Sequence, residues 1–434
     1  MPTEPASSTQ NYKYPLIVAL ASSFGTGLEI YDFLIYGFVA VVFSELFFPS
    51  SNPSTSLLLT FAVFATGFAG RPVGSVFFGH IGDKYGRKNT FALTMIVLAI
   101  VSLLTAVLPT YAQIGLAAPL ALTILRFMQG FSLGGESGGG LVLTAEEAPK
   151  QYRALYTAIG NTGNSWASFF APGLVALFSS ALGASSFVLI GWRLLFLIGA
   201  AVGVVGTIIR HKLRESLIFD KVIIGEKKGL RIPIAELLSK YWKKVLLGIG
   251  YTLIVTVVSY TTGVFTASYL ENTVKISVPI ASEIVSLGAI PNLVFLLIFA
   301  FLADKYGRRP ILTCGAIGSL VFVYPYFVLL GSGNFSTMLT AQVIFQIISA
   351  MLLSSLIVYL IEMFPTDVRY TGTGFSNNIA VGVFGGLTPF IASYLIIITS
   401  NALSPVIWIA AAAVVSLSLY VTTMYETART DIAN

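Results

Sequence analysis

The chain has 434 residues, of which 56% are apolar and only 10% charged, and its net charge is +6. Its mean hydropathy of +0.84 excludes an ordinary soluble domain, whose core does not need so many apolar side chains. The basic residues are divided among short loops between apolar segments, which excludes a nucleic-acid partner and favours a protein surrounded by lipid.

The chain begins with a polar stretch, residues 1–14, which lacks the charged-then-apolar order of a cleavable signal peptide. We therefore expect the first hydrophobic segment to be kept as a membrane span. One cysteine and two histidines leave neither an intrachain disulfide nor a metal-ligand cluster, so we expect no metal and no other cofactor.

Twelve transmembrane helices are predicted, which makes this an all-α membrane protein. An α-helical span needs about 20 apolar residues at a rise of about 1.5 Å each. The predicted limits are 16–43, 57–79, 90–108, 117–144, 154–182, 187–209, 244–270, 281–303, 310–330, 337–364, 371–399 and 404–425.

The loops between the spans decide the orientation, because short cytoplasmic loops collect Lys and Arg. The basic residues that follow even-numbered spans are Lys84, Arg87, Lys88, Lys150, Arg153, the run 210–244, Lys305, Arg308, Arg309 and Arg369. The loops after odd-numbered spans hold almost none besides Lys275. We expect a multi-pass protein of the cell membrane with both termini in the cytoplasm.

The longest connection divides the spans into two sets of six. We predict an N-terminal six-helix bundle at 1–209, a cytoplasmic linker at 210–243 and a C-terminal six-helix bundle at 244–434. Within the linker, 215–224 and 233–244 mix apolar and charged residues, which predicts short helices on the membrane surface.

The two halves share a repeat. The heptapeptide at 82–88, Gly-Asp-Lys-Tyr-Gly-Arg-Lys, returns at 303–309 as Ala-Asp-Lys-Tyr-Gly-Arg-Arg. Four further pairs share one offset (362 − 146 = 216): Glu146 and Glu362, Pro149 and Pro365, Arg153 and Arg369, and Asn161 and Asn377. This predicts two pseudo-symmetric bundles of the same orientation, related by an axis along the membrane normal.

Ionised side chains inside the bilayer are costly, about 2.5–3.5 kcal/mol each, so they face the bundle interior and usually have a function. Those that stand out along the predicted spans are Glu29, Asp32, Arg71, Arg126 and Glu136 in the first half, and the spans of the second half contain none away from their ends. Glu29 and Asp32 share one helical face with Tyr36, and Arg126, Gln129 and Glu136 share another. Two such stripes predict two helices that face one aqueous cavity.

A carboxylate is the only candidate proton carrier, because the spans hold no histidine. We predict proton coupling at Asp32, Glu29, Arg126 and Glu136, with an Asp32–Arg126 pair that opens when Asp32 is protonated. The alternative is an ion-pair network that only holds the first, second and fourth spans together.

Arg71 lies near the middle of the second span. A guanidinium binds a carboxylate through two parallel hydrogen bonds, so Arg71 is a candidate anchor for a carboxylate-bearing substrate. Its alternative is an ion pair with Glu29 or Asp32. The remaining substrate-binding candidates are neutral polar or aromatic residues, for each of which helix packing is the alternative. They are Tyr36, Gln129, Asn161, Asn164, Trp166, Tyr260, Asn292, Gln342, Gln346 and Asn377.

These motifs resemble those of the major facilitator superfamily. The signature loop between the second and third spans is matched by Gly79, Gly82, Asp83, Lys84, Gly86, Arg87 and Lys88. The closer similarity is to metabolite:proton symporters such as citrate, α-ketoglutarate, shikimate and proline/betaine permeases. It rests on residues 28–33, 71–74, 79–83, 126–132, 134–136, 191–193 and 214–216.

The resemblance covers the whole chain and implies proton-coupled import of a small organic acid or zwitterion by alternating access of a monomer. The Asp32 and Arg126 arrangement is similar to the first-span aspartate and fourth-span arginine of related symporters. A sugar is not favoured, because the motifs of sugar porters after span six and in span seven are absent. An uncoupled facilitator or an exporter of the same fold stays open. We expect neither a receptor, because the termini in this sequence are too short for a signalling domain, nor an enzyme, because no catalytic cluster is visible.

The repeated loops are predicted to form gates at the cytoplasmic ends of the halves. In the first half, Gly82 allows a close approach, Asp83 binds the helix N-terminus that opens span eleven, and Arg87 pairs with Glu146 or Glu147 in a cluster with Arg153. The counterparts in the second half are Asp304, Arg308, Glu362 and Arg369. By resemblance, these contacts close the cytoplasmic side in one state and break in the other.

Overall fold

The computed structural model describes residues 13–85, 87–134, 139–212, 233–366, 368–428 and 430, and in these ranges the chain is helical without strands. Nine helices of this described part are long and apolar enough to cross a membrane. One of them, Lys150–Val205, holds two predicted spans and breaks at Gly183, whose φ of 74° only glycine adopts readily.

The helices of the first half are α1 (Lys13–Phe38), α2 (Ala40–Phe47), α3 (Pro53–Tyr85), α4 (Arg87–Val107), α5 (Tyr111–Ile114), α6 (Ala117–Gly134), α7 (Gly139–Glu147), η1 (Lys150–Tyr152), α8 (Arg153–Ser186), η2 (Phe187–Gly191) and α9 (Trp192–Lys212). Those of the second half are α11 (Pro233–Lys240), α12 (Trp242–Tyr260), η3 (Thr261–Phe265), α13 (Thr266–Tyr269), η4 (Leu270–Val274), α14 (Val278–Tyr306), α15 (Arg308–Leu330), α16 (Phe335–Met363), α17 (Arg369–Ala380), η5 (Val381–Gly385), α18 (Gly386–Thr399) and α19 (Pro405–Thr422).

The twelve-span prediction is confirmed, and the helices differ from it mainly at their ends. Span two is predicted at 57–79, whereas α3 runs over Pro53–Tyr85, and span eight is predicted at 281–303, whereas α14 runs over Val278–Tyr306. Hydropathy finds only the part of a helix that lies in hydrocarbon, and the helix continues beyond it to satisfy its backbone groups. The domain limits remain predictions, and residues 213–232 of the predicted linker lie outside the described residues.

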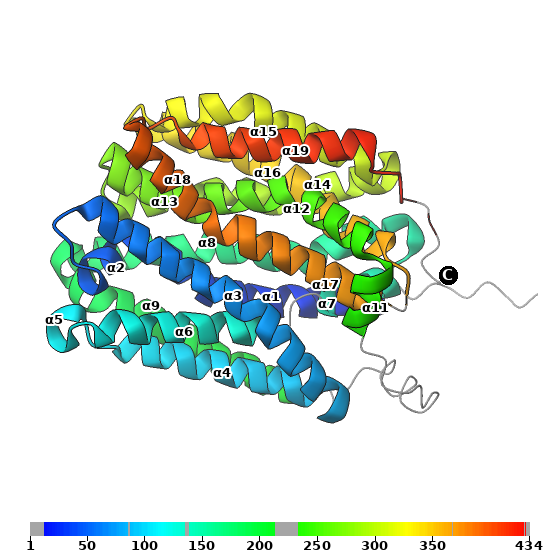
Figure 1. Ribbon diagram of the computed structural model, residues 1–434, viewed down its shortest axis with the longest axis horizontal. Helices are drawn as coiled ribbons and strands as arrows, with labels where there is room; N and C mark the ends of the chain where they lie inside the picture. The colour runs from blue at the N-terminus through cyan, green and yellow to red at the C-terminus, as the bar shows by residue number, and fades with distance from the viewer. Residues whose placement is uncertain are drawn as a thin grey trace, which may run out of the picture.

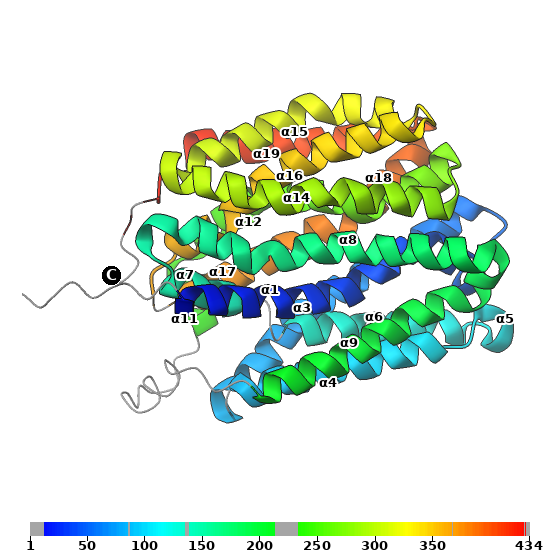
Figure 2. The ribbon, with the colours of Figure 1, turned by 180° about the vertical axis from the view of Figure 1, so that it is seen from behind.

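The two halves lie side by side, with their helices along the long axis of the molecule (Figures 1 and 2). They meet where α8 packs against α14 and where α3 packs against α18. One apolar core lies within the second half, and the other is built mainly from the first half. We call the end that holds α11, the start of α17 and the C-terminal segment the terminal end, and the opposite end, with α2 and α5, the far end (Figure 1).

Glycines bring α3 and α6 into backbone contact inside the first half. A Cβ at Gly130 would overlap the carbonyl oxygen of Gly67, and a Cβ at Gly134 would overlap that of Arg71. Small residues at such spacing let two helices approach closely in a membrane. This contact places Arg71 of α3 and Arg126 of α6 beside the same aromatic side chains.

Candidate functional site

Two buried arginines share an aromatic ring at mid-length of the first half. The Cζ atom of Arg126 lies 3.8 Å from the ring centroid of Phe33, and that of Arg71 lies 4.8 Å from it. The Arg71 Cζ atom also lies 5.1 Å from the ring of Phe68. Guanidinium groups are attracted to aromatic rings at such distances, so Phe33 connects the two cations.

The second half contributes Tyr260 to this cluster. Its ring centroid lies 5.3 Å from that of Phe68 and 6.3 Å from that of Phe64, both on α3. The cluster therefore spans the interface between the halves, where a substrate could contact both.

Arg71 has unused hydrogen-bond donors. Its side chain is buried, and its Nε and Nη2 atoms have no hydrogen-bond partner in the described part of the chain. No ion pair joins it there to Glu29 or Asp32, so the alternative interpretation of Arg71 is wrong. Burying unsatisfied donors of a charged group is costly, which indicates a site that a ligand completes.

Asp32 points into the first bundle and not into a cavity between the halves, and it is only 1% exposed. Its Oδ1 accepts a hydrogen bond from Ser102 of α4 at 2.5 Å, and its Oδ2 accepts one from the Gln129 amide of α6. A Cβ at Gly199 of α9 would overlap Oδ1, so the absence of a side chain at this position makes room for the carboxylate. The prediction that the stripe of Asp32 faces an aqueous cavity is wrong for this residue, because α4 and α9 cover it.

The predicted direct pair between Asp32 and Arg126 is also wrong. Arg126 Nη1 donates to Gln129 Oε1 at 2.7 Å, and Nη2 donates to the carbonyl oxygen of Phe33 at 3.0 Å. Gln129 thus stands between the guanidinium and the carboxylate, and its amide bonds to both. The structure thereby also corrects Gln129 from a substrate contact to a connecting residue, and at 2% exposure it has no free surface.

The other two predicted coupling residues are less defined. Glu29 is buried in α1 and its side chain has an interaction partner. Glu136 lies outside the described residues. Within the described ranges, no three His, Cys, Asp or Glu side chains lie close enough to hold a metal ion.

One of the predicted neutral polar residues, Asn292, joins the two halves, and a second, Gln346, bonds to it within the second half. Ser165 of α8 donates to Asn292 Oδ1 of α14 at 2.7 Å, and Asn292 Nδ2 donates to Gln346 Oε1 of α16 at 3.2 Å. Gln342 is different, because its amide is satisfied within the second half by Tyr326 and by the carbonyl oxygen of Thr262. Its predicted role in substrate binding is therefore replaced by helix packing.

The remaining pocket candidates contribute mostly to packing. The Tyr36 hydroxyl donates to the carbonyl oxygen of Thr60 at 3.1 Å, and Asn164 donates to Asn161 at 2.6 Å. The ring of Trp166 covers Gly27 of α1. Asn377 is half-buried in α17.

A buried ion network closes the terminal end. Arg308 of α15 lies between Asp304, at 2.8 Å, and Glu362, at 3.1 Å. Arg153 of the first half reaches the same Glu362 at 3.0 Å, and Thr427 donates to it at 2.6 Å. The arginines, Glu362 and Asp304 have side chains at most 5% exposed, so the network excludes water.

Asp304 binds the start of a helix in the other half. Its two oxygens accept hydrogen bonds from the backbone N–H groups of Ala154 and Leu155, each at 2.9 Å, in the first turn of α8. This is the contact predicted for its counterpart Asp83 at span eleven, with the halves exchanged. The side chains of Gly82, Asp83 and Arg87 lie outside the described residues.

The predicted grouping of gate residues within each half is wrong for two arginines. Arg369 of the second half pairs with Glu146 of the first at 2.9 Å, as Arg153 pairs with Glu362 in the opposite direction. The two contacts are exchanged reciprocally between equivalent positions of the repeat. Glu147 is half-buried and makes no ion pair in the described part of the molecule.

No motif in the sequence indicates that the C-terminal segment joins this network. Glu426 accepts hydrogen bonds from the backbone N–H groups of Arg308 and Arg309, at 2.9 and 3.2 Å, at the start of α15. The aromatic residues Phe33, Phe64 and Phe68 were also missed. Phe64 and Phe68 are four residues apart on one face of α3, and Phe33 follows Asp32 directly in α1, but aromatic residues are common throughout the spans.

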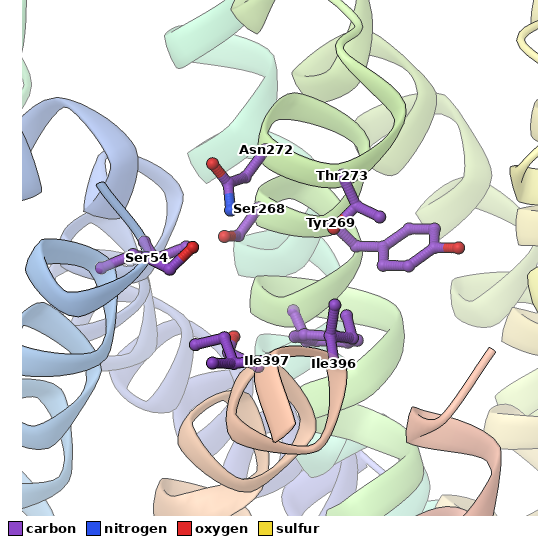
Figure 3. A pocket seen from close by; sticks show the side chains of 10 residues that line it. Ser54, Ser268, Tyr269, Asn272, Thr273, Ile396 and Ile397 are labelled. Carbon is purple, nitrogen blue, oxygen red and sulfur yellow. The ribbon is translucent and has the colours of Figure 1, made fainter. Parts of the chain in front are cut away.

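Two cavities lie at the far end. Figure 3 shows the smaller, about 40 Å³, where Ser54 of α3 faces Ser268 and Asn272 across the boundary between the halves. The second has a volume of about 280 Å³ and is lined by residues such as Glu45, Ser56 and Asn272. The far end is therefore partly hollowed, while at the terminal end a buried network joins the two halves among the described residues.

The chain matches two family models, one described as Sugar (and other) transporter over residues 18–231 and one as Major Facilitator Superfamily over residues 247–432. It is 33% identical over 420 residues to a proline/betaine transporter of Escherichia coli, which covers 94% of this chain and 83% of the relative. It is 35% identical over 386 residues to an inner membrane metabolite transport protein of the same organism, with 87% of each covered. A partially occluded inward-open structure of the xylose transporter from E. coli superposes with a TM-score of 0.75 at 17% identity, covering 95% of this chain and 98% of that one.

Proposed function

This chain belongs to the major facilitator superfamily, and from that premise we propose that it imports a small zwitterionic or carboxylate-bearing metabolite together with a proton. It is a multi-pass membrane transporter and not an enzyme, and it moves its substrate by alternating access. The observation that carries the proposed substrate class is the buried Arg71 guanidinium with unpaired donors at the boundary between the halves.

A substrate carboxylate would complete the hydrogen bonds of Arg71. The fork of its guanidinium fits two carboxylate oxygens, and the low polarity of the surrounding rings strengthens such a bond. Phe68 and Tyr260 stand beside this position, one from each half. The faces of these rings suit the cationic end of a zwitterion. The names of two relatives, which mention proline and betaine, support a zwitterionic substrate.

Asp32 is the proposed proton carrier. It is a fully buried carboxylate in the middle of the first bundle, and it is held by neutral donors from Ser102 and Gln129. A carboxylate that has no direct cationic partner can gain and lose a proton with little rearrangement of charge. Supporting features of the same chain are its arginine at 126 and the absence of histidine from the predicted spans.

The terminal end is proposed to face the cytoplasm, because the Lys-rich and Arg-rich loops lie there. The closed network at Glu362 then corresponds to a state in which the substrate cannot leave into the cell. The far end is the side of entry. One chain holds both halves of the interface, so we propose that a monomer is sufficient.

The test is transport by purified protein in liposomes. Addition of radiolabelled proline or glycine betaine is expected to alkalinise the outer medium, and an inward proton gradient is expected to drive accumulation. The D32N variant should lose this accumulation, because Asn cannot carry the proton, whereas R193K, at an arginine that donates to the carbonyl oxygen of Ala106, should keep it. Uptake without proton movement would leave an uncoupled facilitator, and absence of uptake of both compounds would overturn the substrate class.

A further inference from the structure

The hydrogen bonds around Gln129 fix the direction of its amide. Arginine can only donate, so the atom that faces Arg126 Nη1 at 2.7 Å must be the amide oxygen. The amide nitrogen therefore faces Asp32 Oδ2, which accepts its hydrogen bond. Gln129 holds Arg126 with one end and Asp32 with the other.

Protonation of Asp32 would disturb this arrangement. The bond from Gln129 to the carboxylate is charge-assisted, and it becomes an ordinary or a lost hydrogen bond when the carboxylate is neutral. A proton on Oδ2 would oppose the amide N–H group directly. If the amide then turned to present its oxygen to Asp32, its NH₂ group would face Arg126, donor against donor.

Arg126 transmits the change toward the substrate side. Its guanidinium lies 3.8 Å from the ring of Phe33, and the same ring lies 4.8 Å from Arg71. A Cβ at Gly67 would lie 3.1 Å from both Arg126 Nε and the Phe33 ring, so the three groups fill their space without slack. A shift of Arg126 therefore moves the ring on which Arg71 rests.

We propose that Gln129 is the positioning residue that couples the protonation state of Asp32 to Arg126 and, through the Phe33 ring, to the carboxylate-binding Arg71. This inference rests on the proposed function, because it requires Asp32 to carry the coupled proton. The groups that face Asp32 are Gln129 and Arg126 from α6, Ser102 from α4 and Gly199 from α9. Glu29 lies one turn away on the same helix, and Arg193 of α9 is bound to the carbonyl oxygen of Ala106.

The test compares the pH dependence of KM for proline and glycine betaine counterflow in liposomes. The wild type should bind more weakly as the pH rises. Q129M, which keeps the length of the side chain and removes the amide, should lose this pH dependence while it still transports at acid pH. S102A removes the other partner of Asp32 without touching Arg126, so it should keep the dependence with its midpoint moved to higher pH.

Each outcome decides between the relay and a structural role. A Q129M variant with the wild-type pH dependence, or one whose Vmax falls equally at every pH, would overturn the relay and leave the proposed function standing. If the melting temperature of Q129M shows that this variant is not folded, Q129N replaces it in the test. Q129N keeps the amide on a shorter side chain, and its pH dependence is judged in the same way. A wild type that moves these compounds without protons would overturn the proposed function itself.

Discussion

At the scale of single residues, the site is organised around groups that share a partner. Phe33 lies between two guanidinium groups, Gln129 lies between a cation and an anion, and Glu362 accepts from two arginines and a threonine. In a buried site, such sharing satisfies polar groups that cannot reach water. It also means that a change at one member is felt by the others.

Arg71→Lys tests the carboxylate anchor. Lysine keeps the charge but loses the two-pronged guanidinium, so one charge-assisted hydrogen bond of about 1.5–3 kcal/mol is lost. We expect KM for proline or glycine betaine to rise roughly tenfold to a hundredfold. The measurement is initial uptake into liposomes as a function of concentration. An unchanged KM would show that the carboxylate binds elsewhere.

The sequence identified most of these residues by charge, but not their partners. Asp32, Arg126 and Gln129 were selected because polar groups are costly inside a span. The direct Asp32–Arg126 pair was wrong, because a buried guanidinium bonds to whichever acceptors its helix brings close, and here these are an amide and a backbone carbonyl. Sequence spacing does not contain that geometry.

At the scale of elements, the contact between α3 and α6 positions both arginines. It depends on the absence of side chains at Gly67, Gly130 and Gly134. Span seven is also irregular, since a π-helical turn at η3 follows Tyr260, and Gly385 in the π-helical η5 of span eleven packs against the ring of Tyr260. Such π-helical turns are frequent at functional sites.

Gly130→Ala tests the helix contact. The new methyl group would overlap the carbonyl oxygen of Gly67, so α3 and α6 must separate, at a cost of about 1–3 kcal/mol. We expect a lower melting temperature in detergent together with a loss of transport. Gly263→Ala is the matched control, because a Cβ there meets no atom within 4 Å. If both variants melted alike, close packing at Gly130 would not be what holds α3 against α6.

At the scale of the whole molecule, the two halves hold each other through equivalent positions. Arg153 binds Glu362 and Arg369 binds Glu146, while Asp304 binds the start of α8. Small side chains, including Ala154, Ala158 and Ala300, fill the space beside this network. We propose that the terminal end opens only when these contacts break together, as a switch between two arrangements.

Glu362→Gln and Glu146→Gln form a matched pair for the gate, because the two positions are equivalent in the repeat. Removing one member of a buried ion pair costs about 3–5 kcal/mol, against about 0–1 kcal/mol for a more exposed pair. The side chain of Glu362 is 0% exposed and that of Glu146 is 37% exposed. We therefore expect the Glu362 variant to open the terminal end much more than the Glu146 variant.

The measurement is maleimide labelling of Ala158→Cys, a buried position beside the network, after the exposed Cys314 is replaced by Ser. The labelling rate should rise strongly with Glu362→Gln and little with Glu146→Gln. Equal rates in the two variants would contradict a gate held mainly by the buried network.

The sequence by itself determined the twelve spans, the two similar halves, the charged residues of the first half and the basic loops. These are local properties, because hydropathy and loop charge depend only on neighbouring residues and on the bilayer. Only the tertiary structure decided that Gln129 separates Asp32 from Arg126, that Arg71 forms no ion pair with any residue the structure describes, and that Arg153 pairs across 209 residues with Glu362. Those contacts depend on how the helices pack and rotate against one another. A polar side chain in a predicted span indicates that it needs a partner, but not which group that partner is.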